Sequence, residues 1–513
     1  MKKRFESVSI ALFTLVISTS LILSGCGAAA PSAPQPTAQT KKDTITIAIP
    51  SEPSTMDVQF ADDGNMRAVG DNVTESLLTL DGKTMKVIPE LATDVTRIDN
   101  TTWDVKLRPK VTFQNGNPLT ADDVIYSVKR IIDPTFKSNI AGFFATIKDV
   151  QKVGDLEVHI ITTGPDPSLP TRLTMLDILN QKEMLASPDK IKTAVSGTGP
   201  YKIASWTKGQ NIILERNDSY WGPKPPIKTV KYRFIEEDAT RAAALKNGEV
   251  DFATNMLPEY VSTLPQVQTA EGLEFSLVRM NAVSGVMKDQ KIRQAASYAI
   301  NWDAIAKSLY SGYASIAPGQ VFKPSYFGFD KNLKAYPFDL AKAKQLLAES
   351  GYNGQTIEFV GEQGRWLKDG EQEQAIAQML RDAGFKVDVK LLAFSQWLDV
   401  LFPKNPNTTP PDMIFTFHSN DIYDADRTYS TYVLTTGPAS SYPNTLDAQI
   451  NTARTELDLT KRQQDYEAIG QTLYDNPAWI NGINIKDIDG MGKDVVYQPR
   501  EDMRLIVSEM SFK

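Results

Sequence analysis

The sequence predicts a mixed α/β protein built in at least two blocks, and three observations support this prediction. Apolar residues alternate with polar ones in some segments, as in strands, and recur at helical spacing in others. The two patterns are intermixed along the chain, which is typical of α/β architectures. The chain has 513 residues, which is enough for two or three domains.

The start of the chain resembles a secretory signal. Lys2, Lys3 and Arg4 precede an almost uninterrupted apolar stretch at 10–23, and small residues follow it. Cys26 comes next and is the only cysteine, so the chain can form no internal disulfide and no metal site built on cysteines. The alternative is an ordinary signal peptide that happens to contain a cysteine.

Leu23-Ser24-Gly25-Cys26 resembles the lipobox of bacterial lipoproteins. The resemblance implies that residues 1–25 are a lipoprotein signal peptide and that lipid on Cys26 anchors the protein to a membrane. Residues 26–42 are rich in small residues and proline, which favours a flexible, lipid-anchored linker. We therefore expect the protein on the outer face of the cytoplasmic membrane, or in the periplasm if the cell has an outer membrane.

The folded part is expected to begin at residue 43 with a strand, because Ile45, Ile47 and Ile49 alternate with smaller residues. Thr120 and the acids that follow it predict the start of a helix that ends before Pro134. Similar patterns predict further helices near 240–247, 292–300, 340–350 and 375–383, and strands near 103–107, 250–252 and 385–391.

Motifs for chemistry are scarce. The chain has two histidines, His159 and His418, and neither has a partner at the spacing that zinc sites use. The G-x-S-x-G motif of serine hydrolases does not occur. A net charge of −7 argues against nucleic acid as a partner. We expect no cofactor and no enzymatic activity, although an exported hydrolase stays open because catalytic partners need not be close in sequence.

Several motifs in order resemble the family 5 extracellular solute-binding proteins, the receptors of peptide- and nickel-type ABC importers. They are LTADDVIYSVKRIIDP at 119–134, GTGPY at 197–201, IRQA to YAIN at 292–301 and YPFD to GY at 336–352. Asn301 stands where the family usually has Asp.

The resemblance implies a two-lobed periplasmic-binding-protein fold of type II with an extra subdomain, known as cluster C. Lobe I would comprise residues 43–279 and 480–513, with the extra subdomain at about 60–195, and lobe II would comprise 280–479. The lobes of such a monomer close on a ligand, and the closed form docks on the permease of an ABC importer.

A peptide ligand, oligopeptide or dipeptide, is the first expectation, and a nickel chelate or a sugar is the alternative. Gly364-Arg365-Trp366 resembles a segment of peptide-type members whose arginine meets the ligand carboxylate. Arg365 could instead be a structural or solvated arginine, and Trp366 could be a pocket wall or simple packing. A cell-surface adhesin would fit the anchor but not these motifs.

Residues 417–427 fall where peptide binders carry an acidic loop that holds the ligand amine. This alignment makes Asp421 the candidate amine partner, with a helix cap or turn as the alternative role. His418 could bind a metal chelate or only line the loop. Trp206 and Trp397 could wall the cleft or pack in the core.

Arg130 and Arg293 lie inside family motifs on predicted helices. Their positions favour structural salt bridges over ligand binding.

Overall fold

A computed structural model describes residues 42–60, 63–403, 405 and 408–513. The predicted signal peptide at 1–25, Cys26 and the linker up to residue 41 lie outside the described residues. Within the described part, no helix combines the length and the apolar character needed to cross a membrane.

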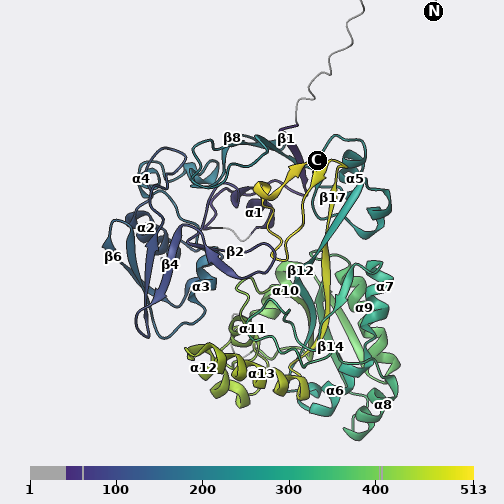
Figure 1. Cartoon of the computed structure of the whole chain (residues 1–513). Helices are drawn as coiled ribbons and strands as arrows, with labels where there is room; N and C mark the ends of the chain where they lie inside the picture. Colours follow the sequence, from purple (N-terminus) through teal and green to yellow (C-terminus); the bar gives the residue numbers. More distant parts are fainter. Residues whose placement is uncertain (1–41, 61–62, 404, 406–407) are drawn as a thin grey trace, which may run out of the picture. The chain divides into compact units, whose positions relative to one another are not determined.

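A sheet of eleven strands runs through the described chain. Its central pair is β12 (Gln266–Met280) and β17 (Trp479–Met491), two long antiparallel strands (Figure 1). The strands on one side of the pair are β16 (Met413–His418), β14 (Thr356–Glu362) and β15 (Lys386–Leu392). The strands on the other side are β11 (Phe252–Ala253), β1 (Thr44–Ile49), β10 (Thr229–Phe234), β9 (Asn211–Arg216) and β8 (Tyr201–Thr207). β13 (Ala314–Ile316) also pairs with β17.

The first core surrounds β1, which pairs in parallel with β10 and β11. Ile45, Ile47 and Ile49 are fully buried, as the alternation predicts. Ala48 is also fully buried because it packs on the other face with Leu245 of α5 (Asp238–Lys246). A central parallel strand covered on both faces therefore replaces the half-buried strand that the sequence predicts.

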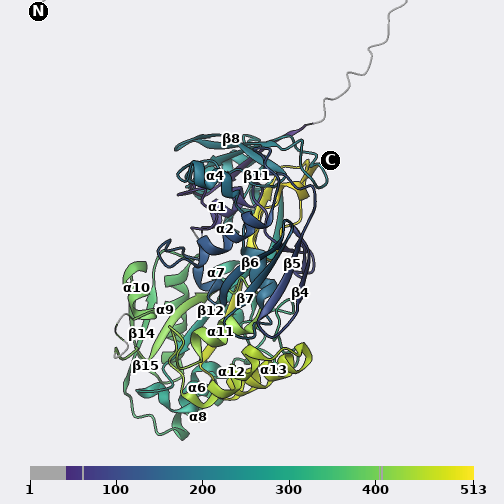
Figure 2. The same ribbon diagram turned by 90° about the vertical axis from the view of Figure 1, so that its left-hand side faces the viewer.

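The extra subdomain contains a sheet of four strands, with α2 (Ala121–Ile132) lying across it (Figure 2). Its strands are β4 (Ala92–Arg97), β5 (Thr102–Leu107), β7 (Glu157–Thr162) and β6 (Ile147–Gly154). The predicted helix start is confirmed, because Thr120 and Asp123 form a capping box. Val124, Val128 and Ile131 of α2 are fully buried in the core of this subdomain.

The second core packs helices against β14, β15 and β16 (Figure 1). These helices are α6 (Gln290–Ala299), α7 (Trp302–Tyr310), α8 (Leu340–Glu349) and α9 (Asp369–Asp382). α10 (Phe394–Leu401) forms a separate small cluster, in which Trp397 and Leu401 pack with Ile414 of β16. Asp339 caps α8 by accepting a hydrogen bond from the Lys342 N–H at 2.8 Å, as predicted. α9 begins six positions earlier than the predicted range of 375–383, because Lys368 and Asp369 start the helix directly after a turn.

The remaining elements complete these cores. A cluster beside the second core contains α11 (Ala425–Tyr432), α12 (Asp447–Thr455) and α13 (Leu459–Asp475). The shorter helices are α1 (Gly64–Gly70), α3 (Leu169–Arg172) and α4 (Gln181–Ala186). Short strand pairs are β2 (Leu78–Leu80) with β3 (Val87–Pro89), and β18 (Val495–Val496) with β19 (Ser511–Phe512).

The strands β12 and β17 run from the first core into the second, so the two cores are not separated by a loop. Val267 of β12 packs beside the first core, whereas Val278 of the same strand is fully buried in the second. The pairing of β12 with β17 shifts register between Glu271 and Phe275. The expected boundary at 279/280 falls at the end of the same strand and stays a prediction.

The two motif arginines are structural. Arg130 forms the predicted salt bridge, with Nη1 at 3.0 Å from Asp57 Oδ1. Arg293 differs from the prediction, because its guanidinium donates to the carbonyl oxygens of Pro477 and Met287 at 2.8 and 2.6 Å. This buried guanidinium joins the segment before α6 to the segment before β17 instead of balancing an acid.

Candidate functional site

A cavity of about 510 Å³ lies where the two cores meet. This volume is within the range of roughly 300–1,000 Å³ that small-ligand sites occupy. The first core contributes residues of α1 and of the C-terminal segment 497–505, and the second contributes the loops after β14 and β16. The crossing strands β12 and β17 add Leu273, Glu274, Asp487 and Asp489. A ligand in this cavity would contact both cores.

Arg365 lines the cavity from the loop after β14, and the backbone of this loop is fixed by Asp369. The Asp369 carboxylate accepts hydrogen bonds from the N–H groups of Gly364, Arg365 and Trp366 at 3.0, 3.1 and 2.9 Å. The Arg365 guanidinium is exposed and lies 4.5 Å from the ring centroid of Phe394. It makes no ion pair within the described residues, so its donors are available to an acidic group.

Trp366 forms an aromatic wall beside Arg365. Its ring stacks on Phe417, with centroids 4.9 Å apart, and meets Trp397 edge-on at 5.6 Å. Trp366 is half-buried and lines the cavity, so it both packs and faces the space. Glu274 lies nearby: burial raises the pKa of its carboxyl group, and the Trp366 side chain and the Arg365 charge oppose that rise.

Asp421 also lines the cavity, but two arginines balance its charge. Its carboxylate accepts a hydrogen bond from Arg427 at 2.8 Å and lies 3.6 Å from Nη1 of Arg67. Burial would raise the pKa of Asp421, yet the two guanidinium groups bring it below its ordinary value. Asp421 is therefore ionised and links α1 of the first core to the loop after β16.

Three of the six predicted ligand residues, Arg365, Trp366 and Asp421, are brought together, and the other three lie elsewhere. Trp397 is buried in α10 and donates to the Phe415 carbonyl at 3.1 Å. Trp206 of β8 donates to Glu52 at 2.6 Å. These two rings support the fold rather than this cavity.

His418 is buried at the end of β16 and does not line the cavity. Its Nε2 lies 2.7 Å from the Thr428 hydroxyl. Burial, reinforced by the Arg427 charge, lowers the pKa of His418 to about 3, so its ring is neutral. Over the described ranges, no group of three or more His, Cys, Asp or Glu side chains could hold a metal ion.

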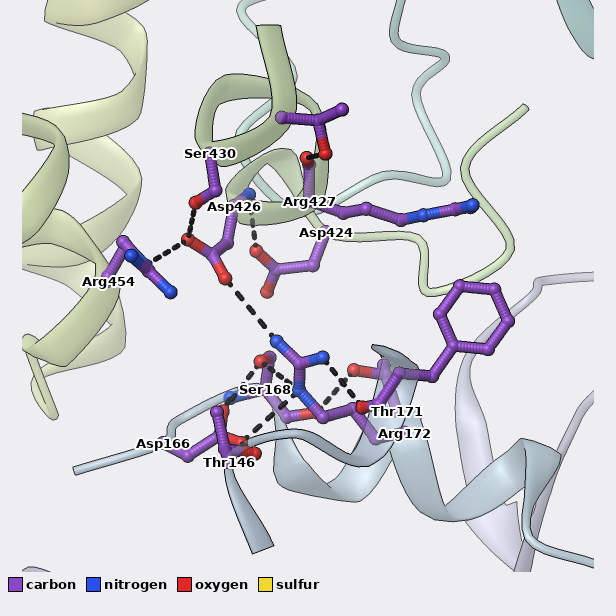
Figure 3. A network of polar contacts seen from close by, with 12 residues as sticks. Thr146, Asp166, Ser168, Thr171, Arg172, Asp424, Asp426, Arg427, Ser430 and Arg454 are labelled. Atoms are coloured by element: carbon purple, nitrogen blue, oxygen red, sulfur yellow. Dashed lines mark hydrogen bonds and ion pairs between the residues drawn. The ribbon is translucent and has the colours of Figure 1, made fainter. Parts of the chain in front are cut away.

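Asp424 and Asp426, in the predicted acidic loop, have structural roles instead. Asp424 caps α11 and pairs with Arg462 at 2.6 Å. Asp426 pairs with Arg454 at 2.9 Å and with Arg172 of the extra subdomain at 3.3 Å (Figure 3). This second pair joins the extra subdomain to α11.

Three acids of the cavity wall, Glu274, Asp487 and Asp489, are not predicted from the sequence. Asp487 and Asp489 are two residues apart in β17 and so share one face of the strand. The pattern that could have revealed them is a pair of acids in a strand whose neighbours are apolar.

The sequence also has a recognisable family signature. Residues 86–440 match the family described as "Bacterial extracellular solute-binding proteins, family 5 Middle", which is more than half of the chain. The chain belongs to this family. The resemblance inferred from the motifs is thereby confirmed, and the family consists of solute-binding receptors.

Curated relatives of this solute-binding protein include two with informative names. A glutathione-binding protein, GsiB, of Pectobacterium atrosepticum is 27% identical over 462 residues, covering 86% of this chain and 88% of the relative. An oligopeptide-binding protein, AppA, of Bacillus subtilis is 25% identical over 389 residues, covering 69% and 72%.

Solved structures confirm the fold class. The substrate-binding protein CtaP of Listeria monocytogenes matches with a TM-score of 0.81 at 22% identity, over 92% of this chain and 99% of that one. AppA of Bacillus subtilis, solved with a nonapeptide, matches with a TM-score of 0.73 at 21% identity, over 92% and 99%. NikZ of Campylobacter jejuni, solved with Ni(L-His), matches with 0.74 at 22% identity, over 92% and 99%. This solute-binding protein therefore has the two-lobed type II periplasmic-binding-protein fold.

Proposed function

We propose that this solute-binding protein captures a short peptide in the cavity between its two cores and delivers it to an ABC importer. Membership of the family supports the receptor role, and the names of GsiB and AppA support a peptide as the ligand class. The observation that carries the proposal is that one cavity presents Arg365 and the acids Glu274, Asp487 and Asp489, none of which forms an ion pair within the described residues. A peptide carries the two complementary charges.

Arg365 is the proposed partner of the peptide carboxylate. A guanidinium offers two parallel donors to a carboxylate, and the Asp369 contacts hold the loop that carries it. Trp366 would cover the adjacent peptide bond with its ring. Asp421 remains the predicted partner of the peptide amine, and the ammonium would compete with Arg427 and Arg67 for its carboxylate.

The nickel-chelate alternative has no specific support in the described residues. His418 is buried, neutral and bonded to Thr428. A neutral sugar has no charged group that could pair with the charged side chains of the cavity.

We further propose that lipid on Cys26 holds the receptor at the outer face of the cytoplasmic membrane, or in the periplasm of a cell with an outer membrane. The lipobox-like segment ending at Cys26 supports this anchor. Labelling with a fatty acid in the source organism should mark the wild-type protein and leave Cys26→Ser unmarked.

Calorimetry of peptide binding tests the role of Arg365. Arg365→Ala should weaken binding of a peptide with a free carboxyl end by roughly 10- to 100-fold. This is the loss of affinity expected when one hydrogen bond to a charged group is removed. The same change should leave binding of the C-terminally amidated peptide nearly unaltered. Arg97→Ala, which removes an exposed arginine of β4, is the matched control.

Equal losses for the free and the amidated peptide in Arg365→Ala would remove the carboxylate role. Failure of the wild-type protein to bind any peptide would overturn the proposed ligand class.

A further inference from the structure

Two acids of β17 form the most unusual part of the cavity wall. Asp487 and Asp489 line the cavity, whereas Ile488 between them packs on the opposite face with α5. Asp489 is 3% exposed, and within the described residues its Oδ1 has no hydrogen-bond partner. A buried carboxylate oxygen without a partner is costly, so this oxygen requires a proton or a cation from outside the chain.

The cavity arginines do not supply that cation. Arg500 forms a two-pronged pair with Asp502 at 2.7 and 3.0 Å. Arg504 pairs with Asp71 at 3.0 Å. Arg67 lies beside Asp421, as described above, so these guanidinium groups have acidic partners already.

The ionisable groups of the cavity that lack an ion-pair partner are therefore unequal in number. Glu274, Asp487 and Asp489 form no ion pair in the described part of the chain, and Arg365 is the one cavity arginine there with no acidic partner. A peptide with neutral side chains would use Arg365 for its carboxylate and would leave the acids of β17 protonated or without a partner. The excess of acid predicts a ligand with an additional positive charge.

We propose that Asp487 and Asp489 form a subsite for a basic side chain, so that the cargo is a short peptide containing lysine or arginine. This inference rests on the proposed function. Residues two apart in a strand are separated by about 7 Å, so one ammonium or guanidinium group between them could bond to both carboxylates. The geometry of the described acids offers no metal cluster, which favours an organic cation.

The protonation of the two acids agrees with this subsite. Burial raises the pKa of Asp487 to about 6, and burial together with the Asp487 charge raises the pKa of Asp489 well above its ordinary value. The other titratable or charged groups that line the cavity are Arg67, Glu274, Arg365, Asp421, Tyr497, Arg500, Asp502 and Arg504. A bound cation would favour ionised carboxyl groups, so binding should release protons near pH 6 and weaken as the pH falls below it.

The test compares two tripeptides, Ala-Lys-Ala and the same peptide with neutral norleucine in the middle, by calorimetry at pH 7. The wild-type protein should bind the lysine peptide at least tenfold more tightly. Asp489→Asn and Asp487→Asn should each remove most of this difference while norleucine-peptide binding persists. Asp388→Asn, on the exposed face of β15, is the matched control and should keep the difference.

Each outcome has a separate meaning. Equal wild-type affinities for the two peptides would overturn the basic subsite but leave the peptide receptor standing. Binding of neither peptide would overturn both the proposed function and this inference. Putrescine serves as a cation that is not a peptide: tighter binding of putrescine than of the lysine peptide would overturn the peptide source of the charge. Proton release with the lysine peptide alone, measured in buffers of different ionisation enthalpy, would support the subsite.

Discussion

The effect of a single carboxyl group on the fold of this protein depends on the groups that surround it. Asp369 accepts three consecutive backbone N–H groups and thereby presents Arg365 to the cavity. Glu373, one turn along the same helix, is fully buried, and both of its carboxyl oxygens lack a hydrogen-bond partner within the described ranges. The first group stabilises the fold as an anion, whereas the second fits the apolar surroundings only while it is protonated.

Glu373 should therefore make the protein less stable as the pH rises. Burial, with the charges of Asp369 and Glu362, raises its pKa to about 9, far above the value in the unfolded chain. Below about pH 4.5 the carboxyl group is protonated in both states. As the pH rises towards 9 it destabilises the fold progressively, because the unfolded chain releases the proton first. Glu373→Gln should raise the free energy of unfolding at pH 7 by about 3 kcal/mol and have little effect at pH 4.

Urea unfolding at both pH values measures this difference. Glu371→Gln is the control, because Glu371 is exposed on the same helix. A Glu373→Gln protein with unaltered stability at pH 7 would mean that the carboxyl group finds a partner when it ionises.

The candidate site was partly predictable at this scale. Arg365 and Trp366 were identified because their segment resembles the family, and both line the cavity. Asp487 and Asp489 were missed because acids alternating with apolar residues are typical of a strand with one face in water. Only the packing of residues distant in sequence places that face in a cavity.

The helices were predictable because the signals that start and end them are local in the sequence. Caps, helical spacing and terminal glycines predicted α2, α5, α6, α8 and α9, because these signals lie within a few residues of each helix end. β12 was not predicted as one strand, since it passes from one core to another and its burial pattern changes on the way. The expected domain boundary was therefore placed inside it.

The capping box of α2 should be worth more than an ordinary cap. Asp123 accepts from the Thr120 N–H at 2.9 Å and also from the side chain of Asn180 at 3.1 Å and the N–H of Gln181 at 2.8 Å. Asp123→Ala should lower the free energy of unfolding by about 2 kcal/mol, since it leaves buried donors unpaired. Thermal unfolding measures the loss.

Asp122→Ala is the matched control, because Asp122 pairs with Lys152 near the surface, where an ion pair contributes little. Equal effects of the two substitutions would show that Asp123 adds nothing beyond the helix end.

The whole molecule depends on contacts between parts that have their own cores. Arg172 of the extra subdomain is buried and pairs with Asp166 at 3.2 Å and with Asp426 of α11 at 3.3 Å (Figure 3). The Arg172 guanidinium also donates to the Phe143 carbonyl at 2.8 Å. This residue is thus a shared support of the extra subdomain and of the helices next to the second core.

Arg172→Met should destabilise the protein by about 3 kcal/mol, because it leaves two buried acids without this partner. It should also lower the amide protection of residues 147–162 more than that of the second core, as hydrogen exchange can measure. Lys152→Met, which removes a surface cation of the same subdomain, is the control. Uniform loss of protection in Arg172→Met would indicate that the parts unfold as a single unit.

The position of Asp487 and Asp489 on a strand that crosses between the cores has a mechanical consequence. When two bodies rotate about a shared pivot, points on the pivot move least and points on the outer arms move most. A cation bound to β17 would stay close to the axis, whereas the loop carrying Arg365 would sweep through the larger arc. During such a rotation the proposed basic end of the cargo would therefore keep its place, whereas its distance from the Arg365 guanidinium would change.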